Sequence, residues 1–457
     1  ATSTRVDRDI KLWDARHWKV LSSHGAFASN FSFSPKDKKS GPIKLGPVIV
    51  DKKIFTLEIV NYDVCYHAIG HGGGEQIRAC AWDSRVSETV SKDYKSLQKN
   101  RYSLAFATAG NDSVIIWDRR GNAWETFKDV KNPAGVAFSK DWFYMAGEEG
   151  IVRRSVGTNP ERTPPEHTAK GLTFCKMTFG PPEKFCAVKD CGKIVVSPDG
   201  RLLVAASKTG IWIIDTTNKS NQPIKVQDAP LDTHFDIGPN SNWLAIGHNS
   251  QNRDYPQNVR IYRLPDAGEP LPSSFTPEKE LDVDGATAVT FSNPLNVDKD
   301  VSGTSPDHLE VDKVLLATGN SESYRFWDVN EDWQEREDLE IPTGDSQTTG
   351  RIEFSPRSTA LAISYSLNKL KVLDPRDMKT LINPTFDQQW PLAFSGDGGV
   401  IATESYDGLF LWDLRAVREQ FKKRDIDWQY LSEFVTPLDM QIMVNVEAEH
   451  STGEKGE

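Results

Sequence analysis

The side chains that could carry out catalysis are scattered along this sequence. Its nine histidines lie far apart, at His17, His24, His67, His71, His167, His234, His248, His308 and His450. The patterns that place a nucleophile, a zinc pair or a phosphate-binding loop are missing, since there is no G-x-S-x-G, H-E-x-x-H or G-x-x-x-x-G-K-[ST]. Residue types suited to hydrolysis are therefore present without the spacing that hydrolysis needs. We expect no catalytic residues and a protein that is not an enzyme.

The cysteines, acidic residues and glycines do not form a metal or phosphate motif either. Cys175, Cys186 and Cys191 follow one another by eleven and five positions, which matches no C-x2-C pair. The acidic stretch Asp298-Lys299-Asp300 lacks the spacing of a calcium loop. The run Gly72-Gly73-Gly74 has no strand-to-helix pattern of the kind that binds phosphate. The sequence predicts no metal site and no cofactor.

The charge and hydropathy of the chain disfavour two classes of partner. Lys and Arg total 54 against 65 Asp and Glu, a net charge of -11, and no basic run tracks phosphates, so nucleic acid is not expected. No stretch approaches the ~18 apolar residues of a membrane span, and residues 1–5 lack the apolar core of a signal peptide. The five cysteines are too few and too irregular for a disulfide scaffold. We expect reduced thiols and a cytoplasmic protein.

What does recur along the chain is a strand that ends in Trp-Asp or a close variant. Each copy follows a second strand-like run, such as the residues 104–110, across a turn such as Asn111-Asp112. Farther upstream a third strand ends in a Ser-Pro or Gly turn, as in Phe354-Ser355-Pro356, and the segment after each Trp-Asp supplies a fourth. The six clear copies are Ile10-Lys11-Leu12-Trp13-Asp14, Val114-Ile115-Ile116-Trp117-Asp118, Ile211-Trp212-Ile213-Ile214-Asp215, Tyr324-Arg325-Phe326-Trp327-Asp328, Leu370-Lys371-Val372-Leu373-Asp374 and Leu409-Phe410-Leu411-Trp412-Asp413, with weaker copies at 57–63, 151–156 and 259–264.

This four-stranded unit, repeated roughly every fifty residues, resembles the WD40-repeat family. The resemblance covers nearly the whole chain and implies an all-β, WD40-type β-propeller of about eight blades, within a range of seven to nine. The family's Gly-His dipeptide survives at Gly70-His71 and is lost or altered elsewhere, so the hydrogen-bond network of regular members is in doubt. We expect the repeated Trp13, Trp117, Trp327 and Trp412 to be buried between adjacent blades.

Two layouts of the chain fit the repeat. In the first, residues 1–446 form a single ring in which the two chain ends share a blade, with 438–446 as the missing strand. In the second, residues 1–70 end a preceding propeller and 75–446 form a seven-bladed propeller. Both layouts include a short C-terminal helix at 414–421, a surface excursion at 293–313 and a disordered tail at 447–457.

The ending of the repeat region carries a second resemblance. Leu411-Trp412-Asp413-Leu414-Arg415 through Arg424-Asp425-Ile426-Asp427-Trp428 is similar to the end of WD40 regions in bacterial multidomain signalling proteins, where the propeller follows a kinase, protease-like or NTPase effector. It implies that this chain is the regulatory C-terminal region of a larger signalling protein.

A binding function predicts anchor residues at one rim of the propeller. Aligning the first strands gives a column of mainly small residues in which Arg78 and Trp390 are the large side chains, beside Thr287. We predict that Arg78, Thr287 and Trp390 bind a protein or peptide partner, although Trp390 could instead pack beside Pro391 and Arg78 could pair with a carboxylate. A protein-interaction or ligand-sensing scaffold is the leading function. The alternative is a stand-alone propeller hydrolase or metal-binding protein.

Overall fold

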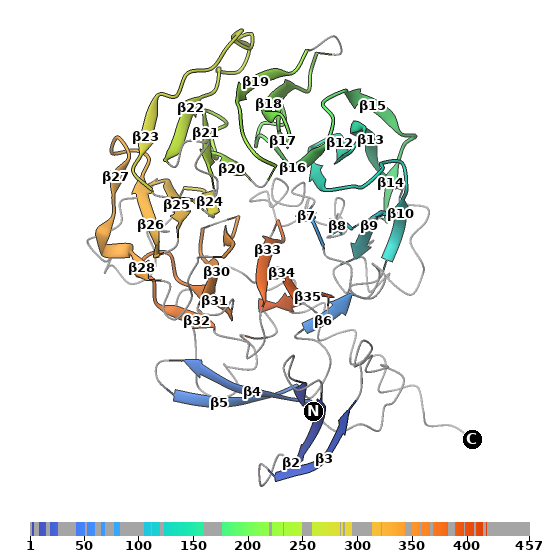
Figure 1. Ribbon diagram of the computed structural model, residues 1–457, viewed down its shortest axis with the longest axis vertical. Coiled ribbons are helices and arrows are strands. Elements are labelled where there is room, and N and C mark those ends of the chain that lie inside the picture. The colour runs from blue at the N-terminus through green and yellow to red at the C-terminus, as the bar shows by residue number, and fades with distance from the viewer. Residues whose placement is uncertain are drawn as a thin grey trace, which may run out of the picture.

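The computed structural model contains seven antiparallel sheets, the blades, arranged around a common centre (Figure 1); five of them have four strands and two have five. In each blade the strands follow one another from the centre outward. The structure describes residues 2–3, 9–14, 19–25, 43–50, 53–59, 65–68, 77–82, 105–110, 112–118, 123–159, 176–218, 222–231, 233–248, 258–283, 285–286, 288–294, 313–320, 322–342, 350–356, 358–365, 369–382, 389–396, 398–405, 408–414 and 417, with side chains from Ile77 onward.

The first strand of each blade lies innermost. Each of these strands contacts the first strand of the next blade, and β33 contacts β7, so the series closes into a ring. Because seven such strands complete the circuit, the fold is an all-β propeller of seven blades, within the expected range of seven to nine. The inner strands of blades 1 to 7 are β7 (Ala79–Trp82), β11 (Gly135–Phe138), β16 (Cys191–Val196), β20 (His234–Ile237), β24 (Ala288–Phe291), β29 (Ile352–Phe354) and β33 (Trp390–Phe394).

The second and third strands pair as a hairpin in the middle of each blade, with a connection of two to four residues in six blades and of eleven residues in blade 4. In blades 1, 5 and 7 the third strand ends at Trp-Asp. The second strands are β8 (Ala105–Ala109), β12 (Trp142–Gly147), β17 (Leu202–Ser207), β21 (Trp243–Gly247), β25 (Leu315–Gly319), β30 (Leu361–Tyr365) and β34 (Val400–Ser405). The third strands are β9 (Val114–Asp118), β13 (Gly150–Asn159), β18 (Gly210–Asp215), β22 (Val259–Arg263), β26 (Ser323–Asp328), β31 (Lys369–Leu373) and β35 (Gly408–Asp413).

The outer strands are the most irregular part of the blades. Blade 2 carries two pieces, β14 and β15, and blade 5 carries β27 and β28 around a 3-10 turn at Glu337–Leu339. The outer strands are β10 (Ala123–Phe127), β14 (Lys176–Phe179), β15 (Glu183–Cys186), β19 (Ile224–Gln227), β23 (Lys279–Leu281), β27 (Gln334–Glu335), β28 (Ile341–Pro342), β32 (Thr380–Ile382) and β6 (Cys65–Ala68).

Blade 7 combines strands from distant parts of the chain. Its outer strand β6 pairs antiparallel with β35, with Cys65 opposite Trp412 and Ala68 opposite Leu409. Residues 65–68 therefore cover the otherwise open edge of β35. The segment 438–446, which we expected to supply the missing strand, lies outside the described residues, and both layouts of the chain stay predictions.

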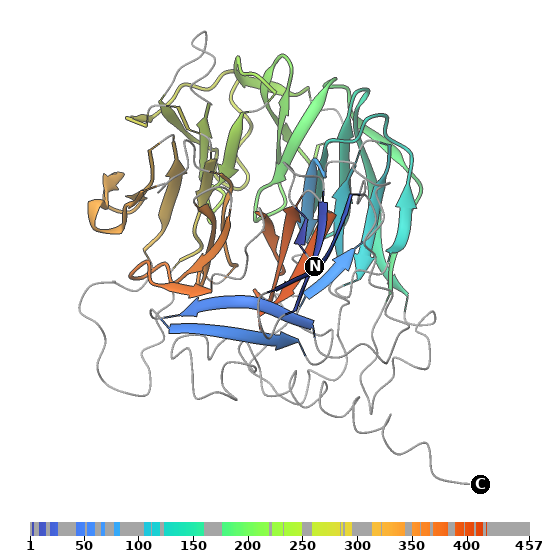
Figure 2. The same cartoon turned by 60° about the horizontal axis from the view of Figure 1, so that its bottom comes forward.

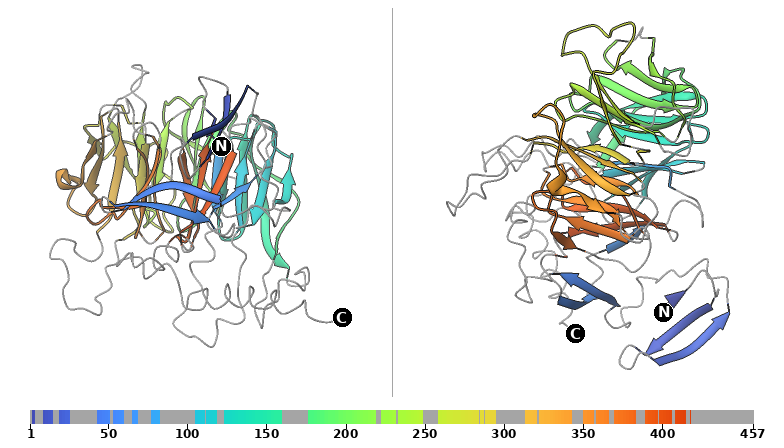
Figure 3. Two further views of the ribbon diagram at one scale, coloured as in Figure 1. Left: turned by 90° about the horizontal axis from the view of Figure 1, so that it is seen from below. Right: turned by 60° about the vertical axis from the view of Figure 1, so that its left-hand side comes forward.

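The remaining N-terminal strands lie outside the ring (Figures 2 and 3). Strands β1 (Thr2–Ser3), β2 (Asp9–Asp14) and β3 (Lys19–Gly25) form one sheet, and β4 (Ile43–Val50) and β5 (Lys53–Ile59) form a hairpin. The Trp13-Asp14 copy of the repeat thus ends β2 of a separate sheet. Of the expected C-terminal helix, Leu414 and Val417 are described, and both are buried. No helix within the described ranges is long and apolar enough to cross a bilayer.

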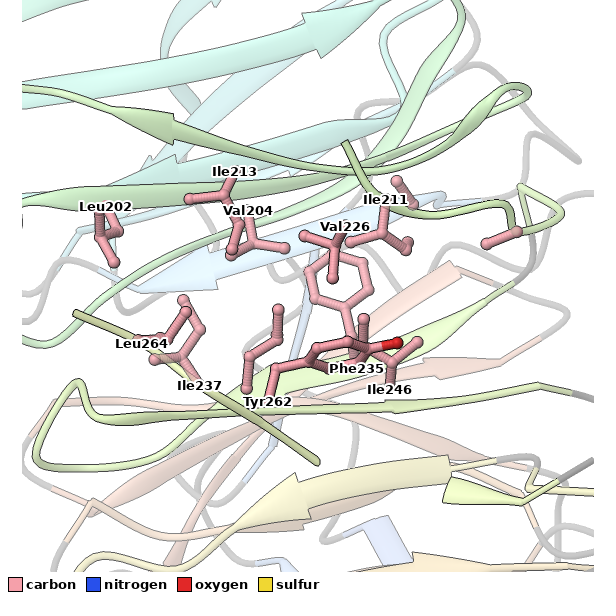
Figure 4. Close-up of a cluster of buried hydrophobic side chains, with 13 residues drawn as sticks. Leu202, Val204, Ile211, Ile213, Val226, Phe235, Ile237, Ile246, Tyr262 and Leu264 are labelled. Atoms are coloured by element: carbon pink, nitrogen blue, oxygen red, sulfur yellow. The ribbon is translucent and has the colours of Figure 1, made fainter. Parts of the chain in front are cut away.

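Apolar side chains from adjacent blades pack against each other between the sheets. Figure 4 shows Val204 and Ile213 of blade 3 facing Phe235 and Tyr262 of blade 4. Each of these four side chains is at most 1% exposed. Because burying one such side chain contributes roughly 1.5–3 kcal/mol, a blade depends on its neighbours for most of its stability.

The repeated tryptophans take the predicted places in these interfaces where they are described. Trp117 packs among Leu392, Val400 and other residues of blade 7, and Trp327 packs among blade 4 residues. The indole Nε1 of Trp117 donates to Thr108 Oγ1 at 2.7 Å, and that of Trp327 donates to Thr318 Oγ1 at 3.2 Å. The side chain of Trp13 lies outside the described residues.

In blade 7 a glutamine takes part in a buried hydrogen-bond network with the tryptophan of the repeat. The loss of the Gly-His dipeptide had put such a network in doubt. Gln389 Oε1 accepts from Trp412 Nε1 at 2.9 Å and from Thr403 Oγ1 at 3.0 Å. Since all three side chains are buried, each bond satisfies a group that would otherwise be costly. The tryptophan anchor therefore survives without the histidine.

The repeated serine fixes the turn between the first and second strands. The hydroxyls of Ser197, Ser355 and Ser395 each accept the backbone N–H of the residue five positions on, at 2.8, 3.0 and 2.9 Å. In blade 5 the equivalent Ser292 accepts from Leu315 at 2.8 Å, a separation of 23 positions. The same kind of bond thus joins the strands on either side of the expected excursion at 293–313, and residues 295–312 lie outside the described part.

We predict that Trp327→Ala lowers the free energy of unfolding by about 3–5 kcal/mol, because it removes a buried aromatic ring between blades 4 and 5. Trp327→Phe is the matched control, since it keeps the ring and removes the bond to Thr318, and it should cost about 1–2 kcal/mol. Chemical denaturation of the purified proteins measures both. Equal stability of the parent and the alanine variant would contradict the interface placement.

We also predict that two truncations of the N-terminus differ sharply. Deleting residues 1–62 keeps β6 and should leave a cooperative, monomeric ring, whereas deleting residues 1–70 removes β6 and exposes the edge of β35. The second protein should unfold at a lower temperature and self-associate. Thermal unfolding and size-exclusion chromatography test this, and identical behaviour of both truncations would argue against closure by β6.

Candidate binding site: the channel and its rim

A channel of about 1360 Å³ runs between the inner strands from one face of the ring to the other. One mouth is bordered by residues just before or at the start of the inner strands, including Arg78, Ala134 and Thr233. The other mouth is bordered by the serine turns, including Pro198 and Pro356. The first mouth, called the rim below, is the one at which we predicted partner binding.

Strand alternation decides which side chains reach the channel. In β20 and β29, Phe235, Ile237, Ile352 and Phe354 are buried in the blades, whereas the residues between them are less buried and line the channel. The column of aligned residues that includes Arg78 and Trp390 is called the rim column. Because successive strand residues point to opposite sides, the residues one and three positions after the rim column face the channel. The sequence-based column therefore marks the entrance, and the two deeper positions form the channel wall.

The charged side chains of the channel wall come from a subset of the blades. Lys193 belongs to blade 3, Asp236 to blade 4, and Arg351 and Glu353 to blade 6. The corresponding wall positions of blades 1, 2 and 7 include Ala79, Ala81, Ala137 and Ala393. The channel thus has a charged side, called the charged wall, and a small apolar side, called the alanine wall.

Several of the charged groups hold neighbouring blades together. Asp236 of blade 4 accepts from Phe291 N at 2.8 Å and from Thr290 Oγ1 at 3.1 Å, both in blade 5, and from its neighbour Ile237 N at 2.9 Å. Lys193 Nζ crosses from blade 3 to donate to Phe235 O at 2.7 Å. These polar ties run along the inner surface where blades converge.

Glu404 links three blades behind the channel wall. It lies on β34 of blade 7, where its Oε2 is 3.5 Å from Arg351 Nη1 of blade 6 and its Oε1 accepts from Ile77 N of blade 1 at 3.1 Å. Burial raises the pKa of Glu404, and both Arg351 and the Ile77 amide oppose that rise. A carboxylate so placed stabilises the ring near its closure.

Glu353 differs from the other carboxylates because it has no hydrogen bond or ion pair with any residue in the described ranges. Removal from bulk water raises the pKa of Glu353 to about 8, with a further rise from Asp236 and opposing effects of Lys193 and Arg351. The nearby His234 has its pKa lowered to about 3 by burial and by the two cations, so its imidazole is neutral. A pKa of about 8 keeps the Glu353 carboxyl mainly protonated at neutral pH.

The described cysteines are poorly suited to nucleophilic chemistry. Cys80, Cys186 and Cys191 are free thiols. Burial raises the pKa of all three, that of Cys191 to about 12, so they stay protonated and unreactive near neutral pH. Cys175 lies outside the described residues.

The described histidines and acidic residues do not assemble a metal site. His248 is buried in blade 4, where its ring nitrogens lie 3.0 Å from Thr233 Oγ1 and 2.7 Å from Gln227 Nε2. Over the described ranges, no three His, Cys, Asp or Glu side chains come together as metal ligands.

The rim brings together two of the three predicted binding residues. Arg78 and Trp390 stand at the start of the inner strands of blades 1 and 7, which contact each other. Arg78 is exposed, and its guanidinium pairs with no residue in the described ranges, whereas Trp390 is half-buried. Thr287 lies outside the described residues, and the binding role of all three stays a prediction.

Leu231 is a rim residue that the sequence column missed. It is 40% exposed, the one large apolar side chain of the described part with this much exposure, and it lines the channel mouth. A Cβ atom on Gly192 would lie 2.9 Å from Leu231 Cδ1, so glycine at this position leaves room for the leucine. The signal in the sequence was Leu231-Asp232, an apolar residue in a polar turn two positions before Thr233.

Comparisons with known proteins add little to this geometry. No protein-family model and no curated protein matches the chain. A similar solved structure is a chain described as "Crystal Structure of Mitotic Checkpoint Complex", with 14% sequence identity and a TM-score of 0.49, over 77% of this chain and 91% of that chain. The fold assignment rests on the strand pairing of this chain itself.

We predict that Glu353→Gln stabilises the protein at high pH. The folded state holds the Glu353 proton up to about pH 8, whereas the unfolded chain loses it near the ordinary value of 4.5. This carboxyl therefore has little effect on stability below about pH 4.5 and an increasingly unfavourable one as pH rises to about 8. Denaturant unfolding at pH 5 and pH 9 should show a larger gain for the variant at pH 9. A pH-independent difference would mean that Glu353 has an ordinary pKa.

Proposed function

We propose that this chain is a non-catalytic scaffold that binds a protein or peptide partner at the rim of its channel. The observation that carries the proposal is the exposed Leu231 at an open channel mouth. Arg78 stands at the same mouth, and its guanidinium pairs with no residue of the described ranges. Exposed apolar and arginine side chains contribute strongly when a partner buries them, and small neighbours such as Ala134 and Gly192 leave that partner access.

The chemistry of the described channel supports binding over catalysis. The thiols stay protonated, and the His248 ring is engaged by Thr233 and Gln227. The arrangement offers hydrogen-bonding and charged groups without an activated nucleophile. The described channel therefore gives no support to the alternative of a hydrolase. A cytoplasmic location, expected from the sequence, is also part of this proposal.

The resemblance of residues 411–428 to the ends of bacterial WD40 regions supports a narrower version of this proposal. In that version the propeller is the regulatory C-terminal part of a larger signalling protein, and partner binding at the rim controls an effector. Sequencing the gene upstream of Ala1 tests it, because an effector in the same reading frame is expected and a stop codon with its own start site would refute it.

Rim variants should lose partner capture without losing their fold. Arg78→Ala combined with Leu231→Ala removes both exposed rim side chains, and Arg78→Ala combined with Trp390→Ala tests the pair predicted from sequence. Each should reduce capture from a lysate of the source organism by roughly tenfold or more, since such anchors dominate interfaces. Quantitative mass spectrometry of captured proteins measures the effect, and circular dichroism checks the fold.

Lys128→Ala is the matched control, because Lys128 is exposed after β10, the outermost strand of blade 1, which β9 and β8 separate from the inner strand that follows Arg78. It should leave capture unchanged. If the rim variants capture the same partners as the parent, or if Lys128→Ala loses them, the outer edges of the blades become the better candidate surface.

A further inference from the structure

The charges of the channel can be assigned to partners one by one. Arg351 faces Glu404, Asp236 is satisfied by two backbone amides and a threonine, and Lys193 is held by a carbonyl and lies 5.1 Å from the centre of the Phe235 ring. Glu353 is the charged residue of this wall to which no such partner can be assigned among the described residues. Its carboxyl lines the channel without a partner in the described part of the chain.

The titratable and charged groups around Glu353 do not compensate it. Lys193 and Arg351 favour its ionised form, Asp236 disfavours it, and His234 is neutral. On blade 1, burial raises the pKa of the Cys80 thiol and Glu353 raises it further, and Arg78 stands farther out at the rim. At the charged wall, three carboxyl groups (Asp236, Glu353 and Glu404) thus lie near two cations, Lys193 and Arg351, and Glu353 is the carboxyl without a bonded partner in the described residues.

The other side of the channel suits an apolar body. The alanine wall presents Ala79, Ala81, Ala137 and Ala393, with Val195 beside them. The channel volume of about 1360 Å³ exceeds the roughly 300–1000 Å³ of common ligand sites, so a guest of moderate size fits inside. A guest that matches both walls has a positive head and an aliphatic stem.

A divalent metal ion matches these groups less well. Both oxygens of Asp236 are already occupied by N–H and O–H donors, which leaves the Glu353 carboxyl as the free oxygen ligand. Calcium and magnesium require about six or more oxygens. Lys193 and Arg351 would also repel a divalent ion more than a single positive charge.

We propose that the channel binds an organic monocation, a primary ammonium or guanidinium group on an aliphatic stem, whose head forms an ion pair with Glu353 and whose stem lies against the alanine wall. When the guest meets protonated Glu353, the carboxyl O–H bond breaks and its proton passes to the solvent buffer. The carboxylate that remains pairs with the cation. The guest is either a free amine or a basic side chain of a partner, and a free amine needs no rim interaction.

Isothermal titration of the full chain with n-butylammonium and with n-butylguanidinium tests the site. The dissociation constant should rise about tenfold for each pH unit below about 8 and level off above it, because binding must displace the Glu353 proton. Close to one proton should be released for each guest bound at pH 7, measured in two buffers that are not primary amines and differ in ionisation enthalpy. Neutral n-butanol should show neither effect.

Two variants and a control locate the binding. Glu353→Gln should abolish both the binding and its pH dependence, whereas Glu278→Gln, the same change at an exposed residue of blade 4, should alter neither. Lys193→Met should move the pH at which the dissociation constant levels off to a higher value, because Lys193 opposes the rise in the Glu353 pKa. Absence of binding by the parent at pH 9, or equal binding by Glu353→Gln, would overturn the proposal; the proton release of the parent tests it even if a variant fails to fold.

A third compound distinguishes a free amine from a basic side chain of a partner as the natural guest. Nα-acetyl-lysine amide has the same head on a stem attached to a peptide backbone. If it binds more tightly than n-butylammonium, the site serves a basic side chain of a partner, and if it binds more weakly, the site serves a free amine. Either order supports the cation site, and neither depends on partner capture at the rim.

Discussion

Closure of the ring is the constraint on which the rest of this structure depends. A four-stranded blade has two apolar faces and cannot bury them alone, so each blade needs a neighbour on both sides. The last interface forms where β33 of blade 7 meets β7 of blade 1, and β6, from the N-terminal part of the chain, completes blade 7 by pairing with β35. That pairing covers the outer edge of blade 7 and ties the two ends of the ring together. Its location explains why Glu404, which links blades 6, 7 and 1, lies beside the closure point.

Closure also creates the channel and limits what can line it. The inner strands converge, so wall residues are either small, like Ala79 and Ala137, or long enough to reach another blade, like Lys193. The charges of the wall are therefore partly structural. Asp236 and Lys193 join adjacent blades through hydrogen bonds that water would otherwise make. Glu353 makes no such bond in the described part, and this separates a group that holds the ring from one that is available to a guest.

Local patterns in the sequence were sufficient for the blades. Trp-Asp endings and serine turns depend on contacts within about fifteen residues, as for Trp117 with Thr108 and Ser355 with Ala360, so they leave a readable repeat. The strand that closes blade 7 could not be found in this way, because its partner β35 lies more than 300 residues away. The sequence analysis selected the rim column and did not consider the charged residues of the channel wall, which lie one or three positions after it. The sequence did contain a sign of these wall residues. Lys193, Asp236 and Glu353 each lie beside apolar residues in an inner strand, where burying a charge is costly.

The unpaired carboxyl of Glu353 is informative because it is unfavourable. A glutamine at this position would keep the shape and remove the charge, and an alanine would match the opposite wall. Residues that lower the stability of a fold without making a stabilising contact are typical of sites that bind a ligand or a partner. The arginine and leucine at the rim follow the same logic, because exposing Leu231 beside a glycine gains nothing for the isolated ring. The two sites that we propose thus open to the same mouth, with Leu231 and Arg78 at the rim and Glu353 within the channel.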